Sequence, residues 1–254
     1  MNTVFNTIGS SGLMGRMAVS GYSDGGGLAA VERVPLLLPT KHELDAERGR
    51  AQWFDTSGQK GWFMTRGSLY EMLRPYVPTI VAPRWSVART CVPCWKCYRD
   101  THVYAVCVCA PAGWLYSTPD DLDWAASMPE ATRDGRLNVW SMWEALPYAV
   151  TSAYLTRVNG SAMQQLQIIC PAYRPDTSEA AGGRYWMNHC EHCEAKQGDH
   201  FLHGTDHGPG KFLPMSEEAS TEIQFREVEG LLIARGSLDY GDAPLEHIAA
   251  CGSW

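Results

Sequence analysis

The stretch CVPCWKCYRDTHVYAVCV at residues 91–108 carries two patterns that decide the fold. Its first half spaces three cysteines with two residues between each, and two residues let the chain turn so that both sulfurs of a pair reach one ion. In its second half, Val103, Ala105, Cys107 and then Cys109 alternate with other residues, which predicts a strand that carries these residues on one face. The stretch therefore predicts a metal-binding turn that leads into a β-strand.

A second C-x2-C pair lies in RYWMNHCEHCEAKQGDHFL at residues 184–202, again beside a strand-like run. Two such pairs supply four thiolates, and a tetrahedral four-thiolate site suits zinc. We expect a structural zinc ion bound by Cys94, Cys97, Cys190 and Cys193. The long gap between the pairs predicts an inserted segment within a zinc-ribbon arrangement of β-hairpins.

The first pair is open to two interpretations, because Cys91, Cys94 and Cys97 form C-x2-C-x2-C. We choose Cys94 and Cys97, since both pairs then sit at matching places in two hairpins. Cys91 is expected to lie just outside the site. Three interpretations of Cys91 stay open: a ligand, a reactive thiol beside Arg89 and Lys96, or an inert thiol. The remaining cysteines are interpreted as small buried residues: Cys107, Cys109, Cys170 and Cys251.

Two other metal sites compete with this interpretation. An iron–sulfur cluster could use Cys91, Cys94 and Cys97 with a fourth cysteine, although the usual cysteine followed by proline is missing. The segment HFLHGTDH, residues 200–207, could host a second metal through its histidines. A disulfide framework is not expected, because the cysteine count of 9 is odd and no export signal is seen. We therefore expect a cytoplasmic protein.

Composition excludes some classes of protein. The chain has 254 residues, of which 45% are hydrophobic and 19% charged, and no apolar run approaches the length of a membrane span, so no membrane insertion is expected. The net charge of −7 is uneven: residues 1–110 hold 12 Lys and Arg against 8 Asp and Glu, and residues 111–254 hold 9 against 20. A protein that binds nucleic acid through phosphates needs a basic footprint, which the whole chain lacks.

One local cluster could still contact nucleic acid. Four cations and two tryptophans, which can stack on unpaired bases, lie around the first cysteine group. These candidate contacts are Arg84, Arg89, Lys96, Arg99, Trp85 and Trp95. The alternative is that the cations are solvated surface charges and the tryptophans pack in a core.

The chain divides into three expected parts in an α+β fold. Residues 1–32 are rich in Gly and Ser and predict a flexible lead. Residues 33–85 predict a small α+β subdomain with one strand, two short helices over 41–50 and 68–78, and a hairpin in which Trp53 and Phe54 face Trp62 and Phe63. Residues 86–254 predict the zinc-ribbon domain with an inserted segment at 110–185. Helices are expected over 120–128 and 147–158, and one strand pair over 220–241.

The stretches CWKCYRDTHVYAV, YWMNHCEHCEAKQGDHFLH and GPGKFLP resemble a group of uncharacterised bacterial zinc-ribbon proteins. Those proteins carry a CWKC turn before a strand and a later N-x-C-x2-C-G-x-x-x-G-D-x-x-L segment. The resemblance implies zinc bound by the four cysteines and matches Asn188, Gly198 and Asp199. Glu194 stands where that pattern has Gly, and Tyr98 departs likewise. Because Gly allows positive φ at little cost, the second turn of this chain is expected to be slightly strained or differently shaped.

A second resemblance covers residues 34–80, which are similar to a small domain attached to plasmid primase-like proteins. Together the two resemblances imply a plasmid or other mobile element and a zinc-stabilised fold, with no established activity. No nucleophile elbow, phosphate loop or dinucleotide fingerprint is present, and no small-molecule substrate is expected. Asp120, Asp121 and Asp123 could bind a hard cation, but a helix start explains them better.

The sequence therefore predicts a non-catalytic interaction or regulatory protein that binds a host or plasmid protein, for example as an inhibitor of conjugation or defence. The alternative is a nucleic-acid-binding accessory factor in DNA processing. The partner and the oligomeric state do not follow from the sequence.

Overall fold

The computed structural model describes part of the chain, and the described residues decide which expectations can be compared with it. These are residues 33–37, 52–56, 59–65, 76, 78–82, 84–108, 114–116, 143–145, 149–205, 208–214, 216–238 and 254. Outside them lie the expected lead, the expected helices over 41–50 and 120–128, and all but residues 76 and 78 of the expected helix over 68–78.

The N-terminal part of the described chain forms a three-stranded antiparallel sheet in the order β1-β3-β2. Its strands are β1 Arg33–Leu36, β2 Gln52–Thr56 and β3 Gln59–Thr65. Trp53 and Trp62 face each other across the β2–β3 hairpin, with ring centroids 5.3 Å apart in an edge-to-face arrangement. Such cross-strand aromatic pairs stabilise a hairpin. The hairpin and its facing tryptophans are confirmed.

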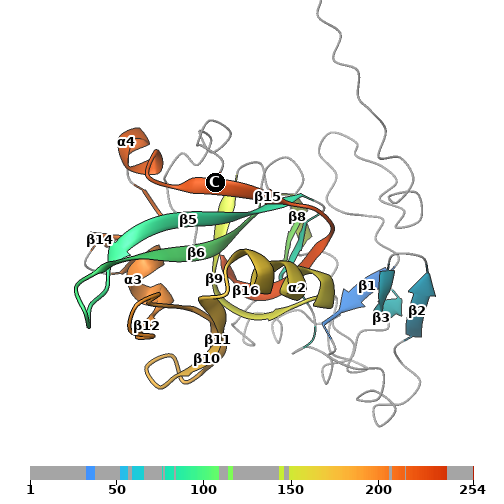
Figure 1. Ribbon diagram of the computed structural model, residues 1–254. Helices are drawn as coiled ribbons and strands as arrows, with labels where there is room; N and C mark the ends of the chain where they lie inside the picture. Colours follow the sequence, from blue (N-terminus) through green and yellow to red (C-terminus); the bar gives the residue numbers. More distant parts are fainter. Residues whose placement is uncertain are drawn as a thin grey trace, which may run out of the picture.

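Most of the other described strands form one eight-stranded antiparallel sheet in the order β15-β5-β6-β9-β16-β4-β7-β8 (Figure 1). In chain order they are β4 Ile80–Ala82, β5 Trp85–Pro93, β6 Asp100–Val108, β7 Trp114–Tyr116, β8 Trp143–Ala145, β9 Val150–Val158, β15 Gln224–Val228 and β16 Leu232–Leu238. β4 pairs in this sheet although it lies in the range expected for the small subdomain. β9 pairs with β6 although it lies in the expected insert.

A short connection forces this sheet to curl. β15 and β16 are four positions apart in the strand order, which corresponds to about 19 Å across a flat sheet. The chain from Val228 to Leu232 makes four peptide steps, which reach about 15 Å at most. The two ends of this run of strands must therefore approach each other. Consistent with that, the indole N–H of Trp85 in β5 donates to the Gly230 carbonyl between β15 and β16 at 3.0 Å.

The central strand β6 is buried on both faces, so the sheet has a core on each side. Tyr104, Val106 and Val108 belong to a core with helix α2, Gly160–Ile169. The alternate residues Val103, Ala105 and Cys107 belong to the second core, with Leu202, Phe212, Ile223 and Phe225. The alternation expected for this strand is confirmed, except for Cys109, which lies outside the described residues.

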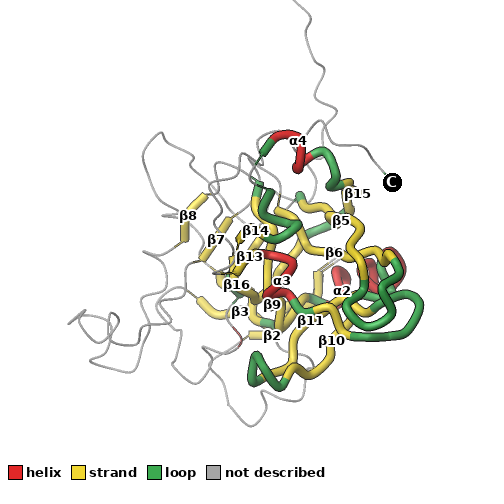
Figure 2. Tube along the Cα trace, turned by 90° about the vertical axis from the view of Figure 1, so that its left-hand side faces the viewer, coloured by secondary structure: helices red, strands yellow, loops and turns green. Residues whose placement is uncertain are grey.

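The segment around the second cysteine pair forms a separate antiparallel sheet in the order β10-β11-β12. Its strands are β10 Tyr173–Ser178, β11 Gly183–His189 and β12 Lys196–Gln197, and helix α3 Asp199–His203 follows. The remaining short elements are β13 Gly204–Thr205, β14 Gly208–Pro209 and α4 Glu217–Ser220 (Figure 2). Gly210 is required after β14, because a Cβ there would lie 2.3 Å from the Leu202 carbonyl.

The helix expected over residues 147–158 is wrong, since this segment contains strand β9. β9 pairs with β6 on one side and β16 on the other, and Val150, Thr151, Ser152 and Ala153 are all buried. A strand covered on both faces shows no polar alternation, so its periodicity does not distinguish it from a buried helix. Its β-branched residues were the signal for a strand.

The expected strand pair over 220–241 is half right. Both strands exist, but they do not pair with each other: β15 pairs with β5, and β16 pairs with β9 and β4. The described residues are thus mostly β, in antiparallel sheets with few helices, and the expected α+β class fits them only loosely.

Candidate metal centre

The two cysteine pairs occupy equivalent hairpin loops. The first loop, residues 94–99, joins β5 to β6, where Pro93 is paired with Asp100. The second loop, residues 190–195, joins β11 to β12, where His189 is paired with Lys196. Each loop has six residues and begins with a cysteine. The matching hairpin positions expected for Cys94–Cys97 and Cys190–Cys193 are therefore present.

The backbone of the two loops follows one pattern. In the first loop, the Cys94 amide donates to the Arg99 carbonyl at 2.9 Å, and the Tyr98 amide donates to the Cys94 carbonyl at 2.9 Å. The second loop repeats both bonds, at 2.8 Å from Cys190 to Ala195 and 3.0 Å from Glu194 to Cys190. These bonds close each loop before any side chain is considered.

An amide also donates to the first sulfur of each loop. The Lys96 amide lies 3.4 Å from Cys94 Sγ, and the His192 amide lies 3.4 Å from Cys190 Sγ. Hydrogen bonds of this kind favour the thiolate, which is the form that binds metal. In both loops, the amide therefore favours the thiolate form of the first cysteine.

The residue after the second cysteine is left-handed in both loops. Tyr98 has φ 60° and Glu194 has φ 58°. The left-handed region costs a side chain that glycine does not carry. The positive φ of Glu194 agrees with the strain expected in the second turn, and Tyr98 shows that the first turn adopts the same conformation.

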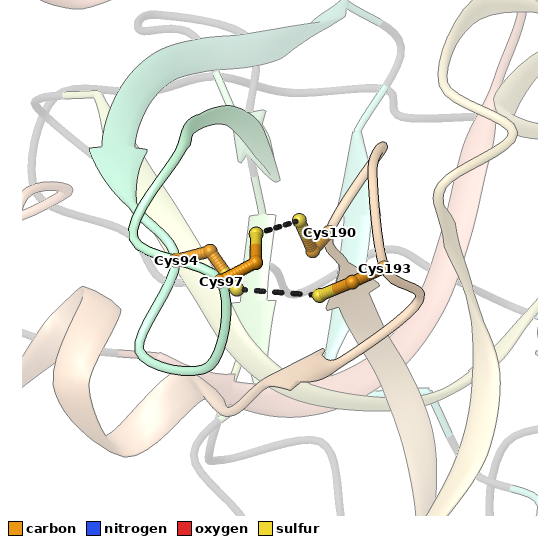
Figure 3. Close-up of side chains that lie close together, drawn as sticks. All are labelled: Cys94, Cys97, Cys190 and Cys193. Carbon is orange, nitrogen blue, oxygen red and sulfur yellow. Dashed lines mark hydrogen bonds between the residues drawn. The ribbon is translucent and has the colours of Figure 1, made fainter.

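Four sulfurs from the two loops face one another (Figure 3). Cys94 Sγ lies 3.7 Å from Cys193 Sγ, Cys97 Sγ lies 3.7 Å from Cys190 Sγ, and all four lie within 4.8 Å of one another. Zn–S bonds of about 2.3 Å in a regular tetrahedron separate the sulfurs by about 3.8 Å. All four cysteines are free thiols rather than disulfides. This cluster could hold one metal ion.

The sulfurs influence one another's protonation. Burial raises the pKa of Cys94, but the backbone amides of Cys97 and Lys96 outweigh burial and lower that pKa to about 6. Burial likewise raises the pKa of Cys190, and the amides of His192 and Cys193 bring it below its ordinary value. For Cys193 a backbone hydrogen bond at Ala195 lowers the pKa, but burial and the other sulfurs raise it to about 12. Four crowded sulfurs cannot all carry charge without a cation, and a divalent ion would favour the thiolate at each.

The two loops brace each other with reciprocal bonds. The indole N–H of Trp95 donates to the Lys196 carbonyl at 2.8 Å, and the His192 ring Nε2 lies 2.9 Å from the Asp100 carbonyl. In both cases, a residue between two cysteines reaches the carbonyl three residues beyond the other pair. Gln197 adds a bond from its amide to Cys94 Sγ at 3.3 Å, which no sequence pattern indicates.

Asn188 and Asp199, the polar residues of the resembling motif, connect the second loop to the large sheet. The buried Asn188 amide bonds both backbone groups of Tyr104, accepting from its N–H at 2.7 Å and donating to its carbonyl at 2.8 Å. Asp199 accepts from the Tyr154 amide at 2.7 Å, where β9 bulges with φ 48°. Gly198, the third matched residue, precedes α3 as its N-cap.

The remaining described cysteines lie outside the cluster. Cys91 is exposed on β5; burial and the charges of Asp100 and Glu191 raise its pKa and outweigh Arg89, which argues against a reactive thiol. The alternative of an iron–sulfur cluster bound by Cys91, Cys94 and Cys97 is therefore not supported, because Cys91 lies outside the group of sulfurs. Cys107 and Cys170 are fully buried, as expected, and burial raises the pKa of Cys170 to about 12. Cys109 and Cys251 lie outside the described residues.

Three of the six candidate nucleic-acid contacts are engaged within the fold. Trp85 is only 1% exposed and belongs to the core, so it is not a base-stacking residue, and its prediction is wrong. Arg84 pairs with Glu227 at 3.2 Å. The guanidinium of Arg89 bonds Gln224 at 3.1 Å and lies 4.1 Å from the Trp254 ring centroid.

The other three candidates gather at the first loop. Trp95 is 64% exposed, and Lys96 and Arg99 are exposed beside it. Tyr98, 84% exposed, lies in the same loop and had not been considered as a contact residue. Its signal in the sequence was an aromatic residue at a position where the resembling pattern has glycine.

The described residues contain no second cluster of three or more metal-ligating side chains. Of the histidines considered for one, His200 is exposed, His203 is buried with its pKa lowered to about 3 by that burial, and His207 lies outside the described residues. Asp120, Asp121 and Asp123 also lie outside them.

Comparison with protein-family models, with curated proteins and with solved structures finds no match to this chain. The site is therefore argued from its own geometry. Among the described residues, no helix combines the length and the apolar character that a membrane span needs.

Proposed function

We propose that the chain is a non-catalytic interaction protein whose two cysteine loops are held together by a structural zinc ion. The observation that carries this proposal is the set of four sulfurs. Cys94 Sγ lies 3.7 Å from Cys193 Sγ, and Cys97 Sγ lies 3.7 Å from Cys190 Sγ. An all-thiolate tetrahedral set favours zinc among the common divalent ions.

A closed site of this kind supports folding rather than chemistry. Zinc with four cysteine ligands has no open coordination position, so it would not activate water. Cys94 and Cys190 are buried, and the two loops come from different sheets. A metal that joins them would contribute its binding free energy to folding.

The exposed aromatic residues of the first loop support a binding role. Trp95 and Tyr98 are large side chains in solvent, and aromatic residues carry much of the binding energy at protein interfaces. Lys96 and Arg99 are exposed in the same loop, while the whole chain carries a net charge of −7. A protein partner fits this mixed surface better than a polyanion does. The resemblance of residues 34–80 supports a host or plasmid protein as that partner.

Two measurements test the proposal. Elemental analysis of the purified protein is expected to give one zinc per chain, and chelation is expected to unfold the protein. A pull-down with and without nuclease is expected to recover a protein partner that resists nuclease. A metal-free, folded protein would overturn the zinc assignment, and partners lost with nuclease would overturn the binding assignment.

The second candidate function is a nucleic-acid-binding accessory factor, favoured by Trp95, Lys96 and Arg99 standing exposed together. Stacking on such aromatics is tolerant of base sequence. Its test is the binding of a labelled single-stranded oligonucleotide at increasing salt, where a steep loss of affinity supports phosphate contacts.

A further inference from the structure

We propose that the tip of the first loop, formed by Trp95, Lys96, Tyr98 and Arg99, binds a short acidic segment of a protein partner. This inference rests on the proposed function, that of an interaction protein, and names the surface and the chemistry of the partner. It does not depend on the zinc chemistry beyond the shape of the loop.

The first step concerns Tyr98. Its φ of 60° is a conformation that glycine adopts without cost, whereas a tyrosine there is strained. The side chain is 84% exposed, and no hydrogen bond, ion pair or ring contact of its phenol is found within the described part of the chain. The strain is therefore not offset by a contact of this side chain inside the molecule, which points to a contact outside it.

The second loop provides the internal control. Glu194 has the same position and nearly the same φ, 58°, but its carboxylate pairs with Arg174. The neighbouring side chains of that loop are also engaged, since Glu191 pairs with His102 at 3.1 Å and Lys196 with Asp176 at 3.1 Å. The charged side chains of both loops are exposed, but those of the second loop pair within the fold, whereas Lys96 and Arg99 of the first loop have no such partner among the described residues.

The charges of the first loop identify the partner. Lys96 and Arg99 are exposed, and neither forms an ion pair with any part of the chain that the structure describes. Two unpaired cations beside two aromatic rings complement a short acidic segment with an apolar anchor. A nucleic-acid strand carries a charge at every phosphate and needs a longer basic surface than two cations on a chain of net charge −7 provide, whereas a short acidic segment needs only these two.

The indole of Trp95 is already fixed in place. Its N–H donates to the Lys196 carbonyl at 2.8 Å, while 64% of the side chain stays exposed. An anchor ring held in its bound position costs less conformational entropy when a partner binds. This bond therefore suits the ring to recognition.

The experiment is a selection of random peptides displayed on phage against the zinc-loaded full chain, followed by affinity measurements on the selected peptides. The key variant is Tyr98→Gly, which removes the phenol and relieves the strained backbone. The matched control is Glu194→Gly, which relieves the same strain in the other loop. A double variant, Lys96→Glu with Arg99→Glu, tests the charges, and a labelled oligo-dT tests nucleic acid.

We expect selected peptides enriched in Asp and Glu, with affinity at least tenfold weaker for Tyr98→Gly and for the double charge variant and unchanged for Glu194→Gly. Tyr98→Gly is also expected to raise Tm, a sign that a merely structural tyrosine would not give. The inference is overturned by peptides that are neutral or basic, by no selected peptide, by affinity insensitive to Tyr98→Gly, or by oligo-dT binding that depends on the same residues. A nuclease-resistant partner that binds these tip variants normally would overturn the inference alone and leave the proposed function standing.

Discussion

The two cysteine loops share one backbone and differ in what their side chains do. Both close with the same amide bonds, both offer an amide to a sulfur, and both hold a left-handed residue after the second cysteine. The second loop fastens itself to its own sheet and to β6 through ion pairs, whereas the first loop leaves aromatic and cationic side chains in solvent. When backbone bonds and four sulfurs fix a loop, its other side chains are not needed to hold its shape. The second loop uses its charged side chains for ion pairs within the fold, whereas the side chain of Trp95 in the first loop gives only one bond to the Lys196 carbonyl.

The largest loss of stability should come from replacing the cysteines, which both loops contribute in the same way. Cys94→Ser and Cys193→Ser are each expected to abolish zinc binding and to lower the free energy of unfolding by several kcal/mol, because structural zinc supplies about 10–16 kcal/mol in small zinc-dependent folds. Zinc content per chain and urea unfolding measure this.

The matched control is Cys91→Ser, since Cys91 is exposed on β5 and lies outside the sulfur cluster. It should leave zinc content and stability unchanged. Zinc retained by a folded Cys193→Ser protein, or lost with Cys91→Ser, would contradict the ligand assignment. It would also contradict the view that each loop supplies two ligands.

The next effect concerns the bridge from the second loop to the sheet that carries the first. Asn188→Ala removes an amide that bonds both backbone groups of Tyr104, leaving a buried donor and a buried acceptor unpaired. Each unsatisfied group costs about 1–3 kcal/mol, so a loss of about 2–6 kcal/mol is expected in urea unfolding with zinc present.

Asn159 offers a matched comparison, because its amide bonds the Leu231 carbonyl and the Ile233 amide, each at 3.0 Å, at a half-buried site. Asn159→Ala should cost less, since water can reach the groups it leaves. Equal losses would mean that burial does not set the strength of these bridges.

The sulfur cluster could be predicted from sequence because its signal is local. Two residues between cysteines fix the reach of each pair, and the alternation after Cys97 identified the strand that begins there. The choice of Cys94 over Cys91 followed from matching the two hairpins, and Cys91 indeed lies outside the cluster. The bonds that connect the loops could not be predicted, because Trp95, His192 and Gln197 find their partners only when distant strands meet.

The large sheet was harder to predict for a different reason. β9 is covered on both faces, so its residues lose the alternation that identifies a strand. β15 and β16 follow each other in sequence, which suggests a hairpin, but the curl of the sheet sends them to different neighbours. Pairing between strands depends on this curl, and no short stretch of sequence encodes it.

A smaller effect, a gain in the free energy of unfolding, should distinguish the two loops when their left-handed residues, Tyr98 and Glu194, are replaced by glycine. Tyr98→Gly is expected to raise the free energy of unfolding by about 1 kcal/mol, because glycine adopts a φ of 60° without strain. Glu194→Gly relieves the same strain but loses the exposed pair with Arg174, worth about 0–1 kcal/mol, so its net change should be close to zero. Thermal and urea unfolding of the zinc-loaded proteins compare the two. A destabilised Tyr98→Gly protein would mean that the phenol supports the fold after all.

The smallest effect concerns a bond that both loops make, from a ring nitrogen to a backbone carbonyl beyond the other loop. Trp95→Phe and His192→Phe keep a ring but remove the ring nitrogen that bonds a backbone carbonyl just beyond the opposite loop. Both bonds lie in exposed side chains, so each loss is expected near the low end of a hydrogen bond, about 0.5 kcal/mol. Equal small changes in urea unfolding would show that the indole ring of Trp95 is held by one bond and otherwise free to meet a partner. A loss above about 1.5 kcal/mol for Trp95→Phe alone would make that ring part of the fold. The contrast between a loop with paired side chains and a loop with unpaired ones would then rest on Tyr98, Lys96 and Arg99.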